Sequence, residues 1–321
     1  MLAVRRYFLG QQTKSRVADE LGISRFKVAR LIDAAIDQGI VQFVIAEPDD
    51  LNAELGEAVR SRYKLDAVLV LNGPDLSTSA LTAPLGSLAA SLLEEVLIDG
   101  QLVGVAWGRT LAAMAGALSQ LAKVDVVQAA GAIAGIDISQ NPVELVRRLA
   151  SLSGGTAYPI YGPMWTEDPA IAQGLRHEPT VAKAIAKFDN IDVLVVGIGS
   201  WDPAESCLCS GFPPAWRSEA LAAGVQADIC GTLVDRSGAE VPTKLDERAI
   251  SITAAQLKRI PEVIGIGGGL EKAEAITAVL RGGWINVLVT DAGVARRLLA
   301  WIKPDFLGSL SSGFSSGRKA R

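Results

Sequence analysis

From residue 67 onward, short apolar runs of strand length alternate with longer stretches of helical pattern. The apolar runs lie at residues 67–71, 101–106, 124–130, 192–199, 262–267 and 285–290. A strand that is apolar at nearly every position is buried on both faces, as happens when crossover helices cover both sides of a parallel sheet. The alternation therefore predicts an α/β fold with a doubly wound, mainly parallel sheet.

The length of 321 residues, with 49% hydrophobic and 21% charged residues, indicates two globular domains of unequal size. Pro48 interrupts the pattern, so we place a small N-terminal domain at residues 1–48. A linker helix is expected over residues 49–64, capped by Asp49 or Asp50 and running to about Tyr63. The large α/β domain then covers 65–307. Residues 308–321, rich in Ser and Gly, are expected to be a disordered tail.

Several classes of protein are excluded by what the sequence lacks. It has no run of 18 apolar residues, and the first residues, MLAVRRYFLGQQ, lack the apolar region of a signal peptide. Cys207, Cys209 and Cys230 are too few for a disulfide framework. We therefore expect a cytoplasmic protein with no membrane partner.

Metal and cofactor motifs are also missing. His177 is the only histidine, and Cys207-x-Cys209 has no CxxC partner, so we expect no metal site. GIGGGL lacks the third glycine of a dinucleotide fingerprint, and no GxxxxGK[ST] sequence exists. We expect no cofactor.

A sequence pattern typical of a helix-turn-helix covers residues 13–43, TKSRVADELGISRFKVARLIDAAIDQGIVQF. Val17, Ala18 and Leu21 recur on one helical face, Gly22 permits a tight turn, and Ile23 fills the gap between the two helices. After the second helix, Gly39 ends the pattern and residues 40–46 are expected to form the strand of a winged variant.

The second helix of this motif is expected to read DNA. Ser24 is its predicted N-cap, and Val28, Leu31, Ile32 and Ala35 are expected to pack inward. Because a recognition helix presents its N-terminal residues to the major groove, we assign base and phosphate contacts to Ser24, Arg25, Phe26, Lys27 and Arg30. The alternative is an ordinary amphipathic helical hairpin whose charges form a solvated face.

Charge is distributed unevenly along the chain. Residues 1–46 contain seven Lys or Arg against four acids, a net charge of +3, whereas the whole chain carries −4 and the remainder therefore −7. Lys and Arg contacts to phosphates supply the non-specific part of DNA affinity. The charge pattern thus favours double-stranded DNA as a partner of the N-terminal domain alone.

Three segments of the large domain combine a buried strand, a Gly-containing turn and a helix, at residues 105–118, 264–280 and 287–299. Ligands of open α/β sheets bind beyond the carboxyl ends of the strands, where helix N-termini attract anions. Gly108, Arg109 and Thr110 suit a phosphate, Lys272 adds a second cation, and Asp291 suits sugar hydroxyls.

Two tryptophans near these loops, Trp107 and Trp165, are candidates for packing against a sugar ring. Each assignment has a structural alternative, because glycines in such turns are often needed only for the backbone. Arg109 and Lys272 could equally form surface ion pairs.

Read in order, LGISR, GIV, GVAWGRTL, VVGIGS, GIGGGLEKAEAITAVLRGGWINVLVTD resemble the SorC family of sugar-responsive bacterial transcriptional regulators, over residues 1 to about 300. The resemblance implies a helix-turn-helix joined to an effector domain of the sugar isomerase and deaminase type. It also implies a homodimer or homotetramer whose operator affinity is controlled by a small sugar, polyol or sugar phosphate. The positions that match the effector loops of the family are Gly108, Arg109, Thr110, Gly199, Ser200, Gly268, Lys272, Thr290 and Asp291.

One departure concerns Val294, where the family tends to carry a hydroxyl residue. Its loss puts a phosphate contact there in doubt and keeps an unphosphorylated polyol or sugar open. Two other functions compete with the regulator. One is a sugar phosphate isomerase or deaminase with an N-terminal helical extension, and the other is a structural DNA-associated protein without an effector.

Overall fold

The computed structural model describes residues 1–10, 12–38, 40–41, 50–133, 141–202 and 204–300. The chain divides into two compact units, Met1–Pro48 and Asp49–Arg321. The expected wing strand at 40–46 lies almost wholly outside the described residues, and so does the tail at 308–321.

The described residues of the N-terminal unit form three helices, α1 (Leu2–Phe8), α2 (Lys14–Leu21) and α3 (Arg25–Asp37). Gly22 ends α2 in the left-handed region, at φ 64° and ψ 32°, which permits the tight turn between α2 and α3. The Ser24 side chain accepts a hydrogen bond from the Lys27 N–H at 3.2 Å, which confirms the predicted N-cap of α3.

A small apolar cluster holds the three helices together. It is built from Ala3, Val17, Ala18, Val28 and Ile32, and Ile23 packs against it as predicted. The expectation for Leu31 is wrong, because this side chain is 40% exposed. Positions 28, 32 and 35 already fill the face of α3 that meets α1 and α2, and position 31 lies at the edge of that face.

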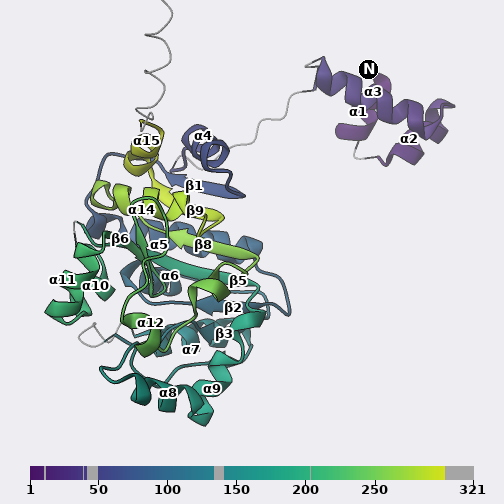
Figure 1. Cartoon of the computed structure of the whole chain (residues 1–321). Coiled ribbons are helices and arrows are strands. Elements are labelled where there is room, and N and C mark those ends of the chain that lie inside the picture. The colour runs from purple at the N-terminus through teal and green to yellow at the C-terminus, as the bar shows by residue number, and fades with distance from the viewer. Residues whose placement is uncertain (11, 39, 42–49, 134–140, 203, 301–321) are drawn as a thin grey trace, which may run out of the picture. The chain divides into compact units, whose positions relative to one another are not determined.

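In the part of the chain that the structure describes, the large unit is built on a sheet of nine strands. Its seven-strand path runs β1-β9-β8-β5-β2-β3-β4 and is parallel throughout, as Figure 1 shows for most of its strands. The antiparallel hairpin β6–β7 pairs with the end of β5. The strands are β1 (Ala67–Leu71), β2 (Leu102–Val105), β3 (Asp125–Gln128), β4 (Ala157–Tyr158), β5 (Val193–Ser200), β6 (Val225–Ile229), β7 (Thr232–Asp235), β8 (Glu262–Ile266) and β9 (Val287–Asp291).

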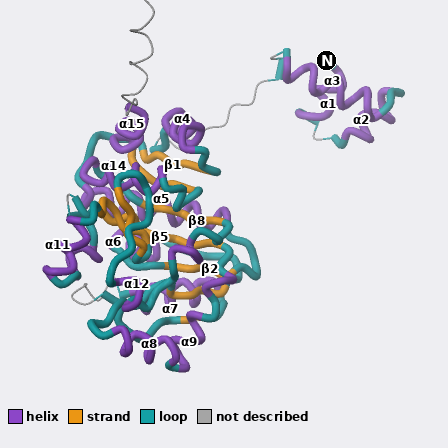
Figure 2. The backbone as a smooth tube through the Cα atoms, in the orientation of Figure 1, coloured by secondary structure: helices purple, strands orange, loops and turns teal. Residues whose placement is uncertain are grey.

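Helices surround this sheet (Figure 2). Helix α5 packs on α6 and on β1 and β9, α7 packs on β2 and β3, and α14 packs on β5 and β6. The helices are α4 (Ala53–Tyr63), α5 (Thr78–Val96), α6 (Arg109–Ala117), α7 (Pro142–Ser153), α8 (Pro169–His177), α9 (Pro179–Ile185), η2 (Phe188–Asn190), α10 (Cys207–Gly211), α11 (Pro214–Ala222), α12 (Leu245–Arg248), α13 (Ala254–Leu257), η3 (Leu270–Lys272), α14 (Ala273–Arg281) and α15 (Ala292–Ala300).

All six predicted strands are present, and the mainly parallel α/β prediction is confirmed. Three strands were not predicted. β4 has only two residues, and β6 and β7 form an antiparallel hairpin that the parallel-strand pattern does not describe. The cap of the expected linker helix is also different, because Asn52 caps α4 by accepting from the Leu55 N–H at 3.0 Å.

The strand order reverses direction between β2 and β5. From β2 the chain proceeds outward to β3 and β4, whereas from β5 it proceeds through β8 to β9 on the other side. A crevice opens at the carboxyl ends of the strands wherever an open α/β sheet makes such a switch, and ligands bind in that crevice. None of the described helices has the length and apolarity needed to cross a membrane.

Candidate functional site

A cavity lies at this switch point, beyond the carboxyl ends of β2, β5 and β8. Its interior volume is about 60 Å³, and it opens to solvent. Its walls come from the start of α5, the turn into α6, the end of β5 with the segment that follows, β6 and η3. The polar side chains that line it belong to Thr78, Thr82, Arg109, Thr110, Glu205, Ser206, Cys207, Asp228, Cys230 and Lys272.

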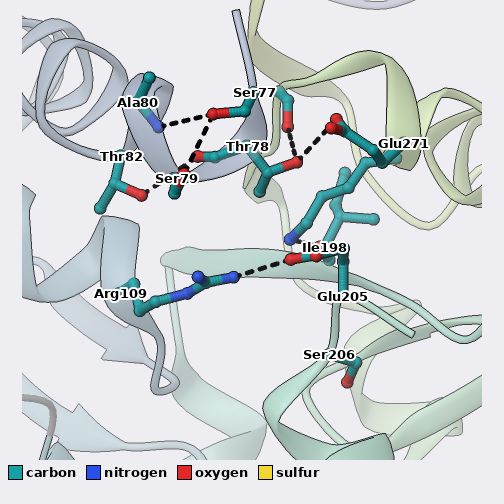
Figure 3. Close-up of polar contacts among 12 residues, drawn as sticks. Ser77, Thr78, Ser79, Ala80, Thr82, Arg109, Ile198, Glu205, Ser206 and Glu271 are labelled. Carbon is teal, nitrogen blue, oxygen red and sulfur yellow. Dashed lines mark hydrogen bonds and ion pairs between the residues drawn. The ribbon is translucent and has the colours of Figure 1, made fainter. Parts of the chain in front are cut away.

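One side of the cavity is the N-terminus of α6. Gly108 is the N-cap and has no side chain to bind the first N–H groups of the helix, which have no intrahelical partner. Arg109 follows, and its guanidinium Nη2 lies 3.0 Å from Glu205 Oε2. Figure 3 shows these two side chains facing each other below the hydroxyls of Thr78 and Thr82. This side combines open N–H groups with a cation, which suits an anion.

The cavity wall also contains a buried carboxylate, Asp228 in β6. Its Oδ1 accepts hydrogen bonds from Trp201 Nε1, at 2.8 Å, and from the Ser206 hydroxyl. Its Oδ2 accepts no hydrogen bond from the described residues. Because Asp228 is 4% exposed and lines the cavity, Oδ2 is an acceptor left for the hydroxyl of a ligand.

Lys272 also lines the cavity. Its ammonium donates to the Ile198 carbonyl at 2.7 Å, where β5 extends past the parallel sheet. Burial lowers the pKa of Lys272, and the negative charge of Asp228 opposes that shift. Burial likewise raises the pKa of Asp228, while hydrogen bonds from Ser206 and Trp201, together with the charge of Lys272, oppose it. Each group thus favours the charged form of the other.

Gly199 is required by this arrangement. A Cβ at this position would collide with Asp228 Oδ1 and Ser206 Oγ. The absence of a side chain lets the carboxylate and the hydroxyl pack directly on the backbone of β5. This close packing places Asp228 against the cavity wall.

The structure brings six of the ten predicted effector residues together as cavity lining: Trp107, Gly108, Arg109, Thr110, Gly199 and Lys272. The other four do not line it. Ser200 and Thr290 are fully buried, with hydroxyls that have no partner among the described residues, and Gly268 packs against Leu81 and Leu85.

Asp291 has a different use from the predicted contact with sugar hydroxyls. It is 4% exposed, and its carboxylate accepts from three backbone N–H groups. Oδ2 binds Gly269 at 2.8 Å, and Oδ1 binds Gly293 at 2.9 Å and Val294 at 3.2 Å. Asp291 therefore holds the turn before Lys272 and caps the start of α15.

Two other residues from the sequence analysis lie away from the cavity. Val294 is fully buried in α15 and does not line it, so a missing hydroxyl there does not bear on this cavity. Trp165 packs edge-on against Phe212, with ring centroids 5.3 Å apart, and is not among the lining residues.

Sequence reasoning missed Thr78, Thr82, Glu205, Ser206 and Asp228. Thr78 and Thr82 could have been found from the sequence, because the polar cluster DLSTS before an apolar run marks a helix start. Ser77 does cap α5, by accepting from the Ala80 N–H at 3.4 Å. No sequence signal pointed to Asp228, since it lies within a strand that itself was not predicted.

The first turns of α3 form a second candidate site, in the N-terminal unit. Ser24, Arg25, Phe26, Lys27 and Arg30 are all exposed, and Phe26 is exposed to 84%. Within the described residues, Arg25, Lys27 and Arg30 form no ion pair, whereas Arg6 and Arg16 both bind Glu20, at 2.7 and 3.2 Å. The cations of α3 are therefore available to a polyanion.

Comparison with known proteins identifies the large unit. The Sugar-bind family model, which describes a sugar-binding domain, matches residues 50–300. The sorbitol operon regulator of Klebsiella pneumoniae is 28% identical over 91% of this chain and 95% of its own length. The deoxyribonucleoside regulator of Bacillus subtilis is 25% identical over 92% of this chain and 96% of its own.

Solved structures agree. The full-length sorbitol operon regulator SorC from Klebsiella pneumoniae superposes with a TM-score of 0.72 at 26% identity, over 92% of this chain and 97% of that one. A sor operon regulator from Shigella flexneri gives 0.71 at 29% identity, over 77% and 99%. These relatives are named as operon regulators, in agreement with the regulator expected from the sequence and not with the isomerase alternative. This chain belongs to the SorC family of sugar-binding transcriptional regulators.

Proposed function

We propose that the first turns of α3 enter the major groove of an operator and that the cavity binds the sugar effector that controls this contact. The proposal for DNA rests on the exposure of five neighbouring side chains and on three cations that lack an ion pair among the described residues. Arg25, Lys27 and Arg30 would bind phosphates or guanine edges, and Phe26 would contact a thymine methyl group. Ser24 has its hydroxyl engaged at the N-cap, so its contact would be to a phosphate.

The observation that carries the effector proposal is the presence of two chemistries in one cavity. Open N–H groups and Arg109 lie at the start of α6, and the free Oδ2 of Asp228 and the ammonium of Lys272 line the same cavity. A sugar phosphate fits this arrangement, with its phosphate at α6 and its hydroxyls at Asp228, Lys272 and Thr78. Trp107 lines the cavity with a nearly buried ring and would limit its depth.

We assign the coupling between effector and operator to α15 and α4. Asp291 ties the turn before Lys272 to the start of α15. At the other end of α15, the Leu298 and Leu299 carbonyls accept from Tyr63 and Arg62 of α4, at 3.3 and 3.1 Å. Since α4 is the first helix after the boundary between the units, a shift of α15 would move the start of the large unit, to which the N-terminal unit is joined. A homodimer or homotetramer in the cytoplasm would place two reading helices on a palindromic operator.

The test begins by selecting a duplex from a random-sequence pool with the full-length protein. The affinity for that duplex is then measured by fluorescence anisotropy with and without pentose and hexose phosphates and the matching free sugars. A ligand that raises the melting temperature should change the affinity by about five- to 150-fold, the usual range of allosteric coupling. Ligands that stabilise the protein without changing its DNA affinity would contradict the proposal, and so would a panel without any ligand.

A further inference from the structure

The cavity contains its own anion at the proposed phosphate position. Glu205 and Arg109 both line the cavity, and their side chains form an ion pair at 3.0 Å. The pair is partly open to water, since the two side chains are 41% and 36% exposed. A pair of this kind is weak, because water screens its charges. A partner that binds Arg109 more strongly can therefore replace Glu205.

The pair is made through one nitrogen of Arg109. Only Nη2 contacts the carboxylate, through Glu205 Oε2. A phosphate group binds guanidinium through two parallel N–H bonds, and the N–H groups at the start of α6 add further donors. Glu205 itself has no bond to these helix donors, since among the described residues its side chain contacts Arg109 alone.

Glu205 is joined by one peptide bond to the residue that contacts Asp228. The next residue, Ser206, donates its hydroxyl to Asp228 Oδ1 and accepts the N–H groups of Leu208 and Cys209, at 3.1 and 3.2 Å. The Glu205 N–H is itself fixed to the Ser200 carbonyl at 2.9 Å. A displacement of the Glu205 side chain is therefore local, with the backbone anchored on both sides of it.

We propose that Glu205 is a built-in competitor for the anionic group of the effector: it occupies Arg109 in the empty cavity and must be displaced when that group binds. This inference deepens the proposed function and rests on it. It makes Glu205 a residue that sets effector selectivity. A neutral sugar leaves the Arg109–Glu205 pair intact, whereas a phosphorylated one exchanges a carboxylate for a phosphate on the same guanidinium.

The experiment compares the full-length protein with Glu205→Gln, using inorganic phosphate as the probe in isothermal titration calorimetry. Removal of the competitor should tighten phosphate binding about three- to tenfold, because it frees Arg109 and removes repulsion between two anions. Arg109→Gln should abolish the difference, so that Arg109→Gln and the double variant Arg109→Gln/Glu205→Gln bind phosphate with affinities that agree within about twofold, set by measurement error.

Glu271→Gln is the matched control. Glu271 is also an exposed glutamate near the cavity, but its carboxylate accepts from the Thr78 hydroxyl at 3.2 Å and forms no ion pair among the described residues. Its replacement removes the same charge without freeing Arg109, so phosphate affinity should change by less than about twofold. Melting temperatures of all variants separate folding defects from binding effects.

Equal phosphate affinity in the wild type and Glu205→Gln would overturn the inference, as would equal effects of Glu205→Gln and Glu271→Gln. Absence of phosphate binding in every protein would also overturn it. These outcomes leave the regulator proposal intact, because that proposal fails only when no effector changes operator affinity.

Discussion

The two units treat positive charge in opposite ways. In α3, Arg25, Lys27 and Arg30 face solvent without an ion pair among the described residues, whereas in the cavity Arg109 binds Glu205 and Lys272 binds the Ile198 carbonyl. A surface that meets a polyanion can leave its cations to water until DNA replaces the water and counterions. In the cavity both cations already have partners in the protein without a ligand, although the Arg109–Glu205 pair remains partly open to water. The comparison teaches that the cations of α3 are ready to bind DNA, whereas the cations of the cavity must exchange a partner in the protein for the effector.

The sharpest way to break this comparison is to remove the free cations. Arg25→Ala and Arg30→Ala should each lower operator affinity by about 10- to 100-fold, because each removes a phosphate or base contact. The effector-induced rise in melting temperature should stay the same. Arg16→Ala is the control, since Arg16 already binds Glu20 at 3.2 Å and should affect DNA affinity less. Equal losses in all three variants would mean that only net charge matters.

A second prediction addresses the partnered cation of the cavity. Lys272→Met should weaken binding of a sugar phosphate by about tenfold or more, because a charge-assisted hydrogen bond is lost. DNA affinity without ligand should be unchanged. Lys258→Met is the control: Lys258 donates to the Gly283 carbonyl at 3.0 Å and lies over the Trp284 ring, so its loss should lower stability but not effector affinity. Calorimetry and anisotropy measure the two affinities.

A third prediction concerns the carboxylate that faces Lys272. Because burial raises the pKa of Asp228, the folded state holds a proton that the unfolded state releases at lower pH. Its ionisation therefore destabilises the protein as pH rises above the unfolded value. Asp228→Asn should raise the melting temperature by about 2–4 °C near pH 8, corresponding to roughly 1 kcal/mol, and the gap should narrow as pH falls. The same variant should weaken effector binding.

Asp235 provides a control of opposite sign. Hydrogen bonds from Ser237 lower the pKa of Asp235, so its ionised form stabilises the folded state at neutral pH. Asp235→Asn should therefore lower the melting temperature near pH 8, with the difference disappearing as pH falls through the lowered pKa. Shifts of the same sign in both variants would contradict the assigned role of burial at Asp228.

The smallest effect is expected at the edge of the apolar cluster in the N-terminal unit. Leu31 is 40% exposed, so Leu31→Gln should change the free energy of unfolding by less than about 0.5 kcal/mol. Ile32 is 3% exposed, and Ile32→Ala should cost about 2–5 kcal/mol. Denaturant unfolding measures both. A large loss in Leu31→Gln would indicate that an oligomer or DNA-bound state buries this side chain.

The parts that the sequence predicted well are those fixed by local physics. A run such as 192–199 is apolar at almost every position, and only a strand buried on both faces satisfies that composition. Ser24 and Gly22 were predicted because capping and left-handed turns depend on the residues at those positions. Leu31 was misplaced because its exposure depends on the angle at which α1 and α2 meet α3, which periodicity does not determine.

The residues of the cavity were harder to predict, because they are brought together by contacts between distant parts of the sequence. Glycine, arginine and lysine in strand-to-helix turns predicted one wall of the cavity, because strands of a parallel sheet end at one edge. Asp228 comes from an antiparallel hairpin, and Glu205 pairs with Arg109 across 96 residues, so nothing local brings either of them there. Asp291 matched a motif, and its two bonds to the Gly293 and Val294 N–H groups are local, but the bond from the Gly269 N–H forms only when β9 lies beside the end of β8.

The central claim is that occupancy of the cavity and binding of DNA by α3 are coupled, and reciprocity tests it most directly. Calorimetry with the wild-type protein would measure the affinity of an effector with and without saturating operator duplex. If the two sites are linked, operator must change effector affinity by the same factor by which effector changes operator affinity, about five- to 150-fold. An effector affinity that is identical with and without operator would contradict the account.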